Sequence, residues 1–319
     1  MDLLAPVRAF DRFQQRHGPL AIPLAVVRKF ADDGAGSHSA LIAYYGFVAI
    51  FPLLLLFTTI LGFVLQDNPS AQQAIIDTAV SDLPVIGNQI KTQSLSGSGI
   101  ALVVGAVGTL LSGLGVTVAA QNAFNTVYAI PHKRRPDFLM TRVRGLAVLV
   151  ALGLLQILST AASGLAGGGL GGHWTLVSGL ALSLTVNLLL FLAVFRLLTH
   201  PSVHWRELFP GIIAATLLWT ALQALGGVYV AHVIRGASEA YGTFATVIGL
   251  IAWMYLGARF VVLSAELNTV IARRLWPRSL LAPPVLDADH RALEALARTE
   301  ERSDEQHIEV TFRDPEKRE

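Results

Sequence analysis

The sequence predicts an all-α polytopic membrane protein with six transmembrane helices and an N-terminal interfacial helix. Of the 319 residues, 53% are hydrophobic and only 14% are charged, whereas about 25% of the residues in soluble globular domains are charged. Six segments contain the roughly 20 apolar residues that a helix needs to cross a bilayer. These expected spans are Leu41–Leu65, Gly99–Tyr128, Val143–Leu165, Leu176–Leu198, Gly211–Ile234 and Phe244–Ile271.

Basic residues predict the orientation of the spans. Arg and Lys gather in residues 1–38, in the loop 131–144, around 196–208 and after residue 272, whereas the alternate connections hold few. Loops rich in Lys and Arg stay on the cytoplasmic side, so both termini are expected in the cytoplasm. The chain then divides into three parts, which are a leader at 1–38, a membrane domain at 39–272 and a cytoplasmic tail at 273–319.

Outside the spans, the sequence predicts three further helices. In the leader, Val7, Phe10 and Phe13 recur at helical spacing with arginines on another face, which is typical of a helix lying on the anionic inner leaflet. A cap packed on the helical bundle is the open alternative. Residues 67–98 should form a short outer helix with one apolar face. The tail should hold one helix near 287–302, followed by a partly disordered polar end.

Small residues recur at three- and four-residue steps along the second span. Helices in a membrane associate where small side chains let their backbones approach closely. This face is therefore expected to form a tight helix interface, and a sliding interface used in gating is the alternative. The residues concerned are Ala101, Gly105, Gly108, Ser112, Gly115 and Ala119.

The sixth span contains two ionisable residues in the stretch ARFVVLSAELN. Arg259 and Glu266 are seven positions apart and therefore share one helix face, which Tyr255 extends. Burial of either charge is expensive unless the group is paired or hydrated. At ~1.5 Å per residue the two lie ~10 Å apart along the axis, so pairing needs water or a third group. We therefore expect a polar pocket shared with spans one, two and four.

Other polar side chains inside the spans are candidates for the same pocket. Carboxamides at membrane depth need hydrogen-bond partners, and Gln121 and Asn125 lie one helical turn apart on the second span. We expect these groups to face one another across the bundle interior. The complete set of pocket candidates is Arg259, Glu266, Asn268, Gln121, Asn122, Asn125, Tyr44 and Tyr255.

No sequence motif predicts catalysis. The chain has no cysteine, which excludes disulfides, thiol catalysis and cysteine-type zinc sites. It also lacks the HExxH, P-loop and GxSxG patterns. His200 and His204 have metal-like spacing but no third ligand, and the basic HKRRP loop is explained by membrane topology. We therefore expect no catalytic residue, metal, cofactor or nucleic-acid partner, and we interpret the chain as not an enzyme.

Four stretches together resemble the YihY/BrkB family of bacterial inner-membrane proteins, formerly misassigned as ribonuclease BN. They are ALIAYYGFVAIFPLLLLF at 40–57, AFNTVYAI at 123–130, ELFPGIIAATLLW at 207–219 and YGTFATVIGLIAWMYLGARFVVLSAELN at 241–268. The resemblance implies six spans in the inner membrane and no established enzymatic activity. Glu266 and Asn268 match the family's end motif. Proposals for the family centre on export or translocation of lipids and other amphiphiles, and on envelope integrity.

Two functions remain open at this point. In the first, the protein transports or binds an amphiphile such as an anionic lipid, Arg259 attracts its headgroup, and Glu266 balances charge or relays protons. In the second, it is a non-transporting envelope scaffold with a purely structural polar core. A hydrated cavity lined by Arg259 and Glu266 would favour transport, and a closed, fully paired core would favour the scaffold. The expected partners are membrane lipids and an amphiphilic substrate, and a homo-oligomer stays open.

Overall fold

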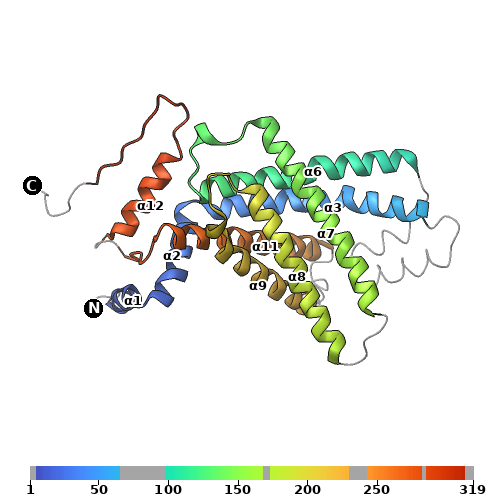
Figure 1. The fold of residues 1–319 in the computed structure, drawn as a ribbon, viewed down its shortest axis with the longest axis horizontal. Helices are drawn as coiled ribbons and strands as arrows, with labels where there is room; N and C mark the ends of the chain where they lie inside the picture. The colour runs from blue at the N-terminus through green and yellow to red at the C-terminus, as the bar shows by residue number, and fades with distance from the viewer. Residues whose placement is uncertain (1–4, 65–97, 168–172, 230–242, 282–284, 313–319) are drawn as a thin grey trace, which may run out of the picture. The chain divides into compact units, whose positions relative to one another are not determined.

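The structure is a computed structural model that describes residues 5–64, 98–167, 173–229, 243–281 and 285–312. Within these ranges the chain forms α-helices, one short 3₁₀ helix and connecting loops, and it forms no strand. The elements are α1 (Ala5–Gln15), α2 (Gly18–Asp32), α3 (Ala35–Val64), α6 (Gly99–Val127), η1 (His132–Arg134), α7 (Phe138–Gly167), α8 (His173–Leu198), α9 (Trp205–Tyr229), α11 (Thr243–Ala272) and α12 (Asp287–Arg298) (Figure 1).

Six of these helices, α3, α6, α7, α8, α9 and α11, are long and apolar enough to cross a membrane. The predicted fold class is therefore confirmed. Four of the helices, α3, α7, α8 and α9, begin at least three residues earlier than the hydropathy pattern indicates, because helical hydrogen bonding continues past the apolar stretch into polar residues such as Arg142 and Arg206. The helix predicted within 67–98 and the end of the fifth span beyond Tyr229 lie outside the described residues.

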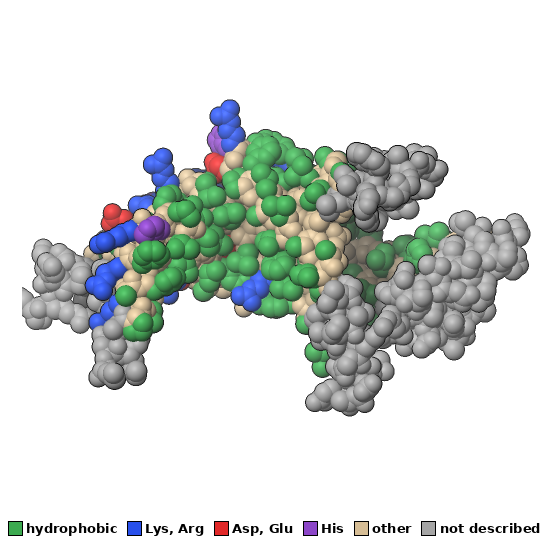
Figure 2. All heavy atoms as spheres, turned by 90° about the horizontal axis from the view of Figure 1, so that it is seen from below, with side chains coloured by type: hydrophobic (Ala, Val, Ile, Leu, Met, Phe, Trp, Pro, Cys, Tyr) green, Lys and Arg blue, Asp and Glu red, His purple; other side chains and the backbone are tan. Residues whose placement is uncertain are grey.

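The chain forms two compact units. The first comprises residues 1–40, 117–222 and 257–319, and the second comprises 41–116 and 223–256. Every contact described below lies within one of these units. In the space-filling view, hydrophobic side chains cover most of the visible face of the described residues, and Lys and Arg side chains gather mainly at one edge of this hydrophobic area (Figure 2).

The core of the first unit joins helices that are distant in sequence. The rings of Phe124 on α6 and Phe195 on α8 meet edge to face, with their centroids 5.0 Å apart. Leu208 and Ile212 on α9 and Val262 on α11 are fully buried. In addition, α7 and α8 pack against one another as a hairpin (Figure 1), and residues 168–172 between them lie outside the described residues.

The second unit confirms the expected interface of small residues. A Cβ atom added to any of three glycines on α6 would come within 3.0 Å of an atom on α3. Only glycine lets the two helices approach this closely, as the small-residue pattern predicts. The nearest atoms are Leu56 N at 2.8 Å from the added Cβ of Gly105, Pro52 Cβ at 2.7 Å for Gly108 and Tyr45 Cδ1 at 2.6 Å for Gly115.

The leader forms two helices with different surroundings. On α1 the apolar residues Val7, Phe10 and Phe13 are exposed, whereas the polar residues Asp11 and Gln14 are buried. An exposed apolar face is what a helix at the membrane surface needs, and the interfacial role of α1 stays a prediction. The polar face of α1 is the one that packs on the rest of the protein.

The second helix of the leader, α2, packs on α11 and α12. Ala25 and Val26 of α2 share a hydrophobic cluster with Val270 of α11, with Leu275 just after that helix and with Ala292 of α12. The C-terminal part of the leader is thus an integral part of the first unit. This packing brings the charged residues at the end of α2 against the last span.

Candidate functional site

Glu266 of α11 is completely buried and pairs with a lysine from the leader. Its Oε2 lies 2.9 Å from Nζ of Lys29, which is itself only 3% exposed. The same Nζ donates to Asp33 Oδ2 at 2.5 Å and to the carbonyl oxygen of Val127 at 2.9 Å. All three ammonium hydrogens therefore have acceptors. We call Lys29, Asp33 and Glu266 the Lys29 cluster.

The Lys29 cluster holds two carboxyl groups and one ammonium group in a site with little access to water. Burial opposes the charge of Lys29, but Glu266 and Asp33 outweigh it and raise the pKa of Lys29. Burial also raises the pKa of Asp33, against the opposing effect of Lys29. A proton on one carboxyl group would make the cluster neutral. The second oxygen of Glu266, Oε1, has no hydrogen-bond partner among the described residues.

Asn268, two residues after Glu266, connects three helices. Its Nδ2 donates to the hydroxyl of Tyr128 at 2.9 Å, and its Oδ1 accepts the backbone N–H of Gly211 at the start of α9. A Cβ on Gly211 would lie 2.5 Å from Asn268 Nδ2 and closer still to the carbonyl oxygen of Ser264. The hydroxyl of Thr269 also donates to the carbonyl oxygen of Val127, at 3.2 Å. The buried end motif thus ties α11 to α6 and α9.

Arg259 and Glu266, which were expected to share a pocket, contact different side chains in the structure. Arg259 is exposed, and its guanidinium lies over the ring of Phe30, 5.3 Å from the centroid. Glu266, two turns later, is covered by Lys29. Both residues therefore face α2, but α2 presents a lysine to one and a phenyl ring to the other. The third group that Glu266 needs comes from the leader.

The remaining pocket candidates are spread over several environments. Gln121 is buried and donates to the backbone carbonyl of Thr141 on α7 at 2.8 Å. Asn125 is buried, whereas Asn122 is exposed. Tyr44 and Tyr255 belong to the second unit, where Tyr44 is 59% exposed. The candidates that the structure brings into one hydrogen-bonded region are Glu266 and Asn268.

Sequence reasoning missed Lys29 and Asp33. The signal was present, because Lys29 continues the buried stripe formed by Ala21 and Ala25 at four-residue steps on α2. A lysine at a position that otherwise faces the core indicates a buried acidic partner. Asp33, one turn after Lys29, supplies one such partner.

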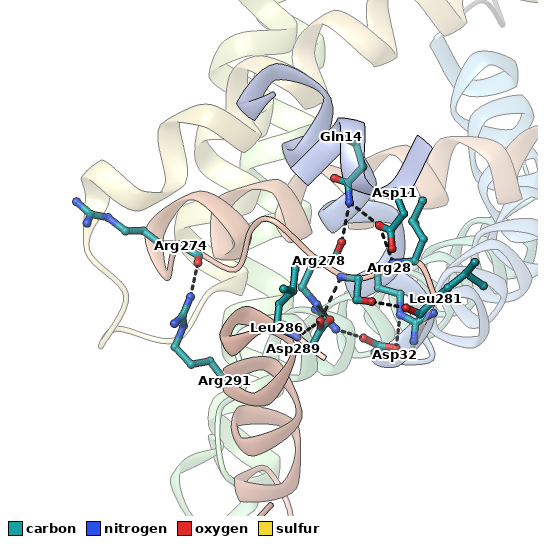
Figure 3. A network of polar contacts seen from close by, with 12 residues as sticks. Asp11, Gln14, Arg28, Asp32, Arg274, Arg278, Leu281, Leu286, Asp289 and Arg291 are labelled. Atoms are coloured by element: carbon teal, nitrogen blue, oxygen red, sulfur yellow. Dashed lines mark hydrogen bonds and ion pairs between the residues drawn. The ribbon is translucent and has the colours of Figure 1, made fainter. Parts of the chain in front are cut away.

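A second polar network fastens α1, α2 and α12 together (Figure 3). Arg278 is 2% exposed and pairs with Asp289 of α12 and, at 2.7 Å, with Asp32 of α2. Gln14 of α1 donates to the carbonyl oxygen of Arg278 at 2.8 Å and to Asp11 at 2.9 Å. Asp32 and Asp33 are neighbours in sequence. The C-terminal end of α2 therefore takes part in both the ion pairs of Arg278 and the Lys29 cluster.

Two of the cavities among the described residues lie in the first unit, and neither of these two is lined by Arg259 or Glu266. The larger has a volume of about 550 Å³ and a strongly basic lining. The smaller, about 280 Å³, lies between α8 and α9 and is lined by leucines, one isoleucine, Thr185 and Thr216. In the part of the chain that the structure describes, no three His, Asp or Glu side chains are placed to hold a metal ion.

The amino-acid sequence is similar to those of bacterial membrane proteins. The family model described as Virulence factor BrkB matches residues 26–285, which include the whole Lys29 cluster. The chain is 24% identical over 251 residues to the "Putative ribonuclease-like protein YfkH" of Bacillus subtilis (strain 168). The matched region covers 75% of this chain and 90% of the relative.

Two further relatives carry membrane names. The "Inner membrane protein YhjD" of Escherichia coli (strain K12) is 24% identical over 275 residues, or 79% of this chain and 81% of the relative. A "UPF0761 membrane protein" of Stenotrophomonas maltophilia (strain R551-3) is 25% identical over 286 residues, or 86% of this chain and 66% of the relative. No solved structure matches the chain.

Proposed function

Because this chain belongs to the Virulence factor BrkB family, we propose that it is an inner-membrane protein that binds and moves a lipid or another amphiphile, with both termini in the cytoplasm. The observation that carries the proposal is the presence of an exposed arginine and a buried glutamate in one apolar span. Arg259 lies midway along the stretch Val247–Ala272. Ionisable groups at such depth are costly, and they commonly mark substrate or ion pathways.

Arg259 supports an acidic headgroup as the recognised part of the amphiphile. Among the described residues, no carboxylate lies within ion-pair distance of its guanidinium, whose described contact is the ring of Phe30. A cation–π contact contributes about 0.5–1 kcal/mol at an exposed site, far less than the cost of placing a charge in hydrocarbon. A phosphate or carboxylate headgroup beside Arg259 would offset that cost.

The Lys29 cluster supports a role in coupling. It places a leader lysine, which lies outside the spans, on a glutamate inside one of them. Two carboxyl groups share one ammonium, so uptake or release of one proton changes the net charge of a buried site. Such a site can link a movement of α2 to protonation. The smaller cavity, between α8 and α9, suits an acyl chain, because its lining is apolar except for two threonines.

A non-transporting scaffold is the second candidate function. The specific observation in its favour is that Glu266 is 0% exposed and ion-paired. A closed pair of this kind can be purely structural, since buried ion pairs often specify one arrangement of a fold rather than carry chemistry.

Reconstitution of the full chain into vesicles separates the two candidates. Vesicles would contain fluorescently labelled phosphatidylglycerol or phosphatidylcholine, and dithionite would quench the label in the outer leaflet, with and without a pH gradient. We expect the wild type to speed loss of the protected fluorescence of labelled phosphatidylglycerol. Arg259→Gln should abolish that acceleration. Arg142→Gln is the matched control, because Arg142 also lies over a phenyl ring, that of Phe138, at 3.5 Å.

The result that contradicts the proposal is a wild-type protein that accelerates neither lipid under either condition. The scaffold would then be the favoured function. Equal activity of Arg259→Gln and wild type would instead remove Arg259 from the proposed path.

A further inference from the structure

The larger cavity lies at the ends of two spans, opens to solvent and is lined by four segments of the first unit. The loop after α6, the residues that follow α11, the helix α12 and the chain after α12 all contribute to its wall. The chain after α12 is held by the loop, since the backbone N–H groups of His132 and Lys133 donate to the carbonyl oxygens of Thr299 and Glu301, each at 3.0 Å. Backbone hydrogen bonds therefore connect two of the segments that line the cavity.

The lining carries a surplus of positive charge. Five basic side chains and two acidic side chains line the cavity. Each acidic side chain already has a basic partner, Glu301 with Lys133 at 2.9 Å and Glu294 with Arg298 at 2.6 Å. The basic residues without such a partner are Arg134, Arg273 and Arg291.

These three arginines have no carboxylate within ion-pair distance in the described part of the chain. Backbone carbonyl groups orient two of them, since Arg291 donates to the carbonyl oxygen of Arg274 at 2.8 Å (Figure 3) and Arg273 to that of Tyr128 at 2.6 Å. Burial lowers the pKa of Arg273, and the more distant carboxylates of Glu207 and Asp33 oppose this shift only in part. Three guanidinium groups thus line one cavity whose two carboxylates, Glu294 and Glu301, are paired with other basic residues.

The backbone beside the cavity is also unusual. Two residues beyond the last residue of α6, and likewise of α11, the chain has a non-glycine residue in a left-handed backbone conformation, Ala129 with φ 47° and Arg274 with φ 51°. This conformation costs roughly 1–2 kcal/mol for a residue with a Cβ. Ala129 lines the cavity and Arg274 supplies the carbonyl that holds Arg291. Both residues close a helix C-terminus in a common way, since the N–H groups of Ile130 and Leu275 donate to the carbonyl oxygens of Asn125 and Val270, so this backbone shapes the cavity wall and is not itself evidence of a ligand.

We propose that this cavity binds a phosphate-bearing anion. Guanidinium groups match phosphate oxygens with paired hydrogen bonds, and a volume of about 550 Å³ falls in the range of small-molecule sites. Among the lining residues the only ring beside that of Pro131 is the imidazole of His307, so recognition rests on the phosphate rather than on stacking of a base.

Two sources can supply the phosphate. Arg273 directly follows the last residue of α11, and Ala129 lies two residues after the last residue of α6. The cavity is therefore close to the end of the apolar region, within reach of lipid headgroups, and it also opens to solvent. A lipid phosphate and a soluble phosphate present the same chemistry to the three arginines.

The experiment uses the purified full chain and has two arms. In the soluble arm, pyrophosphate is titrated into protein in detergent at constant ionic strength, and binding is measured by calorimetry. In the lipid arm, native mass spectrometry measures the retention of phosphatidylglycerol against phosphatidylcholine from mixed micelles. Both arms compare the wild type with Arg134→Gln and Arg291→Gln. The matched control is Arg302→Gln, because Arg302 is exposed, pairs with Glu300 and does not line the cavity.

We expect each cavity variant to weaken binding by about tenfold or more, since a charge-assisted hydrogen bond contributes about 1.5–3 kcal/mol and 1.4 kcal/mol corresponds to tenfold. Arg302→Gln should bind as the wild type does. If the cavity variants bind less pyrophosphate but retain lipid normally, the ligand is a soluble phosphate. If they retain less phosphatidylglycerol but bind pyrophosphate normally, the ligand is a lipid headgroup. Wild-type binding that is absent in both arms, or unchanged in both cavity variants, overturns the proposal.

Arg134→Gln guards against a folding artefact, because Arg134 is exposed and has no ion-pair partner among the described residues. Its unfolding temperature should equal that of the wild type. The outcome is also independent of the transport proposal. Arg259→Gln should leave pyrophosphate binding intact even where it abolishes lipid movement.

Discussion

Lys29 and Glu266 are 237 positions apart in the chain, and the ammonium of one lies 2.9 Å from the carboxylate of the other. This contact fastens the leader to the last span. Because both side chains are almost completely buried, the pair has lost the hydration of both charges, and its attraction must repay that loss. The fold therefore depends on keeping the cluster complete rather than on the pair being intrinsically strong.

The Lys29 cluster predicts an asymmetry between its two obvious single variants. Lys29→Met leaves two carboxyl groups close together without a cation, and it should destabilise the protein by about 3–5 kcal/mol. Glu266→Gln leaves Lys29 paired with Asp33, so its effect should be about 1–3 kcal/mol. Unfolding of detergent-solubilised protein by heat or denaturant measures both effects.

The double variant Lys29→Met/Glu266→Gln completes the cycle. It should be more stable than Lys29→Met alone, because the uncompensated glutamate is gone. Equal losses in the two single variants, or a double variant as unstable as the sum of the singles, would contradict the interaction described for the cluster.

Gly211 allows a second test of the end motif. Gly211→Ala would drive a methyl group into the Ser264 carbonyl and the Asn268 side chain, which should destabilise the protein by roughly 1–3 kcal/mol. Gly153→Ala is the matched control, because a Cβ at this helical position meets nothing within 4 Å. The control should be neutral or stabilising by about 0.5–1 kcal/mol. Similar unfolding temperatures for the two variants would refute the close approach at Gly211.

The spans were predictable because their signals are local. Hydropathy over about 20 residues identifies a membrane helix without reference to any neighbour, and glycine spacing identified the face of α6 that packs on α3. The helix α12 was equally visible in its own sequence. None of these features requires knowledge of which distant segments meet.

The centre of the candidate site was not predictable in the same way. Arg259 is the basic residue that shares the span with Glu266, and the shared helix face suggested a common pocket. The actual partner comes from α2, which the charge pattern had grouped with an interfacial leader. Nothing local indicates that α2 packs across the end of α11 while α1 exposes its apolar face. Tertiary packing therefore decides which ionisable groups meet.

The glycine interface of the second unit predicts a large effect of side-chain size. Gly108→Leu would collide with Pro52, so folded protein in membranes should decrease. Gly153→Leu adds the same side chain at an open position and should accumulate like the wild type. Fluorescence-detected gel filtration of solubilised membranes measures both amounts. A Gly108→Leu variant that accumulates and elutes as the wild type would contradict the packing of α6 on α3.

The chain after α12 contacts the loop after α6 through the ion pair of Glu301 with Lys133. We expect this contact to weaken only at acidic pH. The hydrogen bond from Lys133, followed by that from the backbone N–H of Ile308, lowers the pKa of Glu301 below its usual value, with His307 also facing the carboxylate. A lowered pKa in the folded protein means that this stabilisation is complete above the ordinary value and is lost as the pH falls through the lowered one. Neutral and mildly acidic conditions should leave the contact intact.

The mobility of a spin label attached at Glu305→Cys reports whether the chain after α12 has separated from the loop that carries Lys133. The label should stay restricted from pH 7 to 5 and become mobile as the pH falls below about 4. Adding Glu301→Gln should make it mobile throughout the range. A transition centred near pH 6 or above would show that Glu301 does not control the contact.

The orientation of the chain decides which compartment the basic cavity faces, and the absence of cysteine makes it directly measurable. Basic loops are retained on the cytoplasmic side, so a cysteine at exposed Glu305 should be protected from an impermeant maleimide in intact cells and react after lysis. A cysteine at Asp77, in the predicted outer segment, should react in intact cells. If the two positions exchange behaviour, the cavity faces the other compartment, and a cytoplasmic phosphate cannot be its ligand. If the expected pattern holds, the three unpaired arginines face the leaflet and the solution in which anionic lipids and soluble phosphates can both reach them.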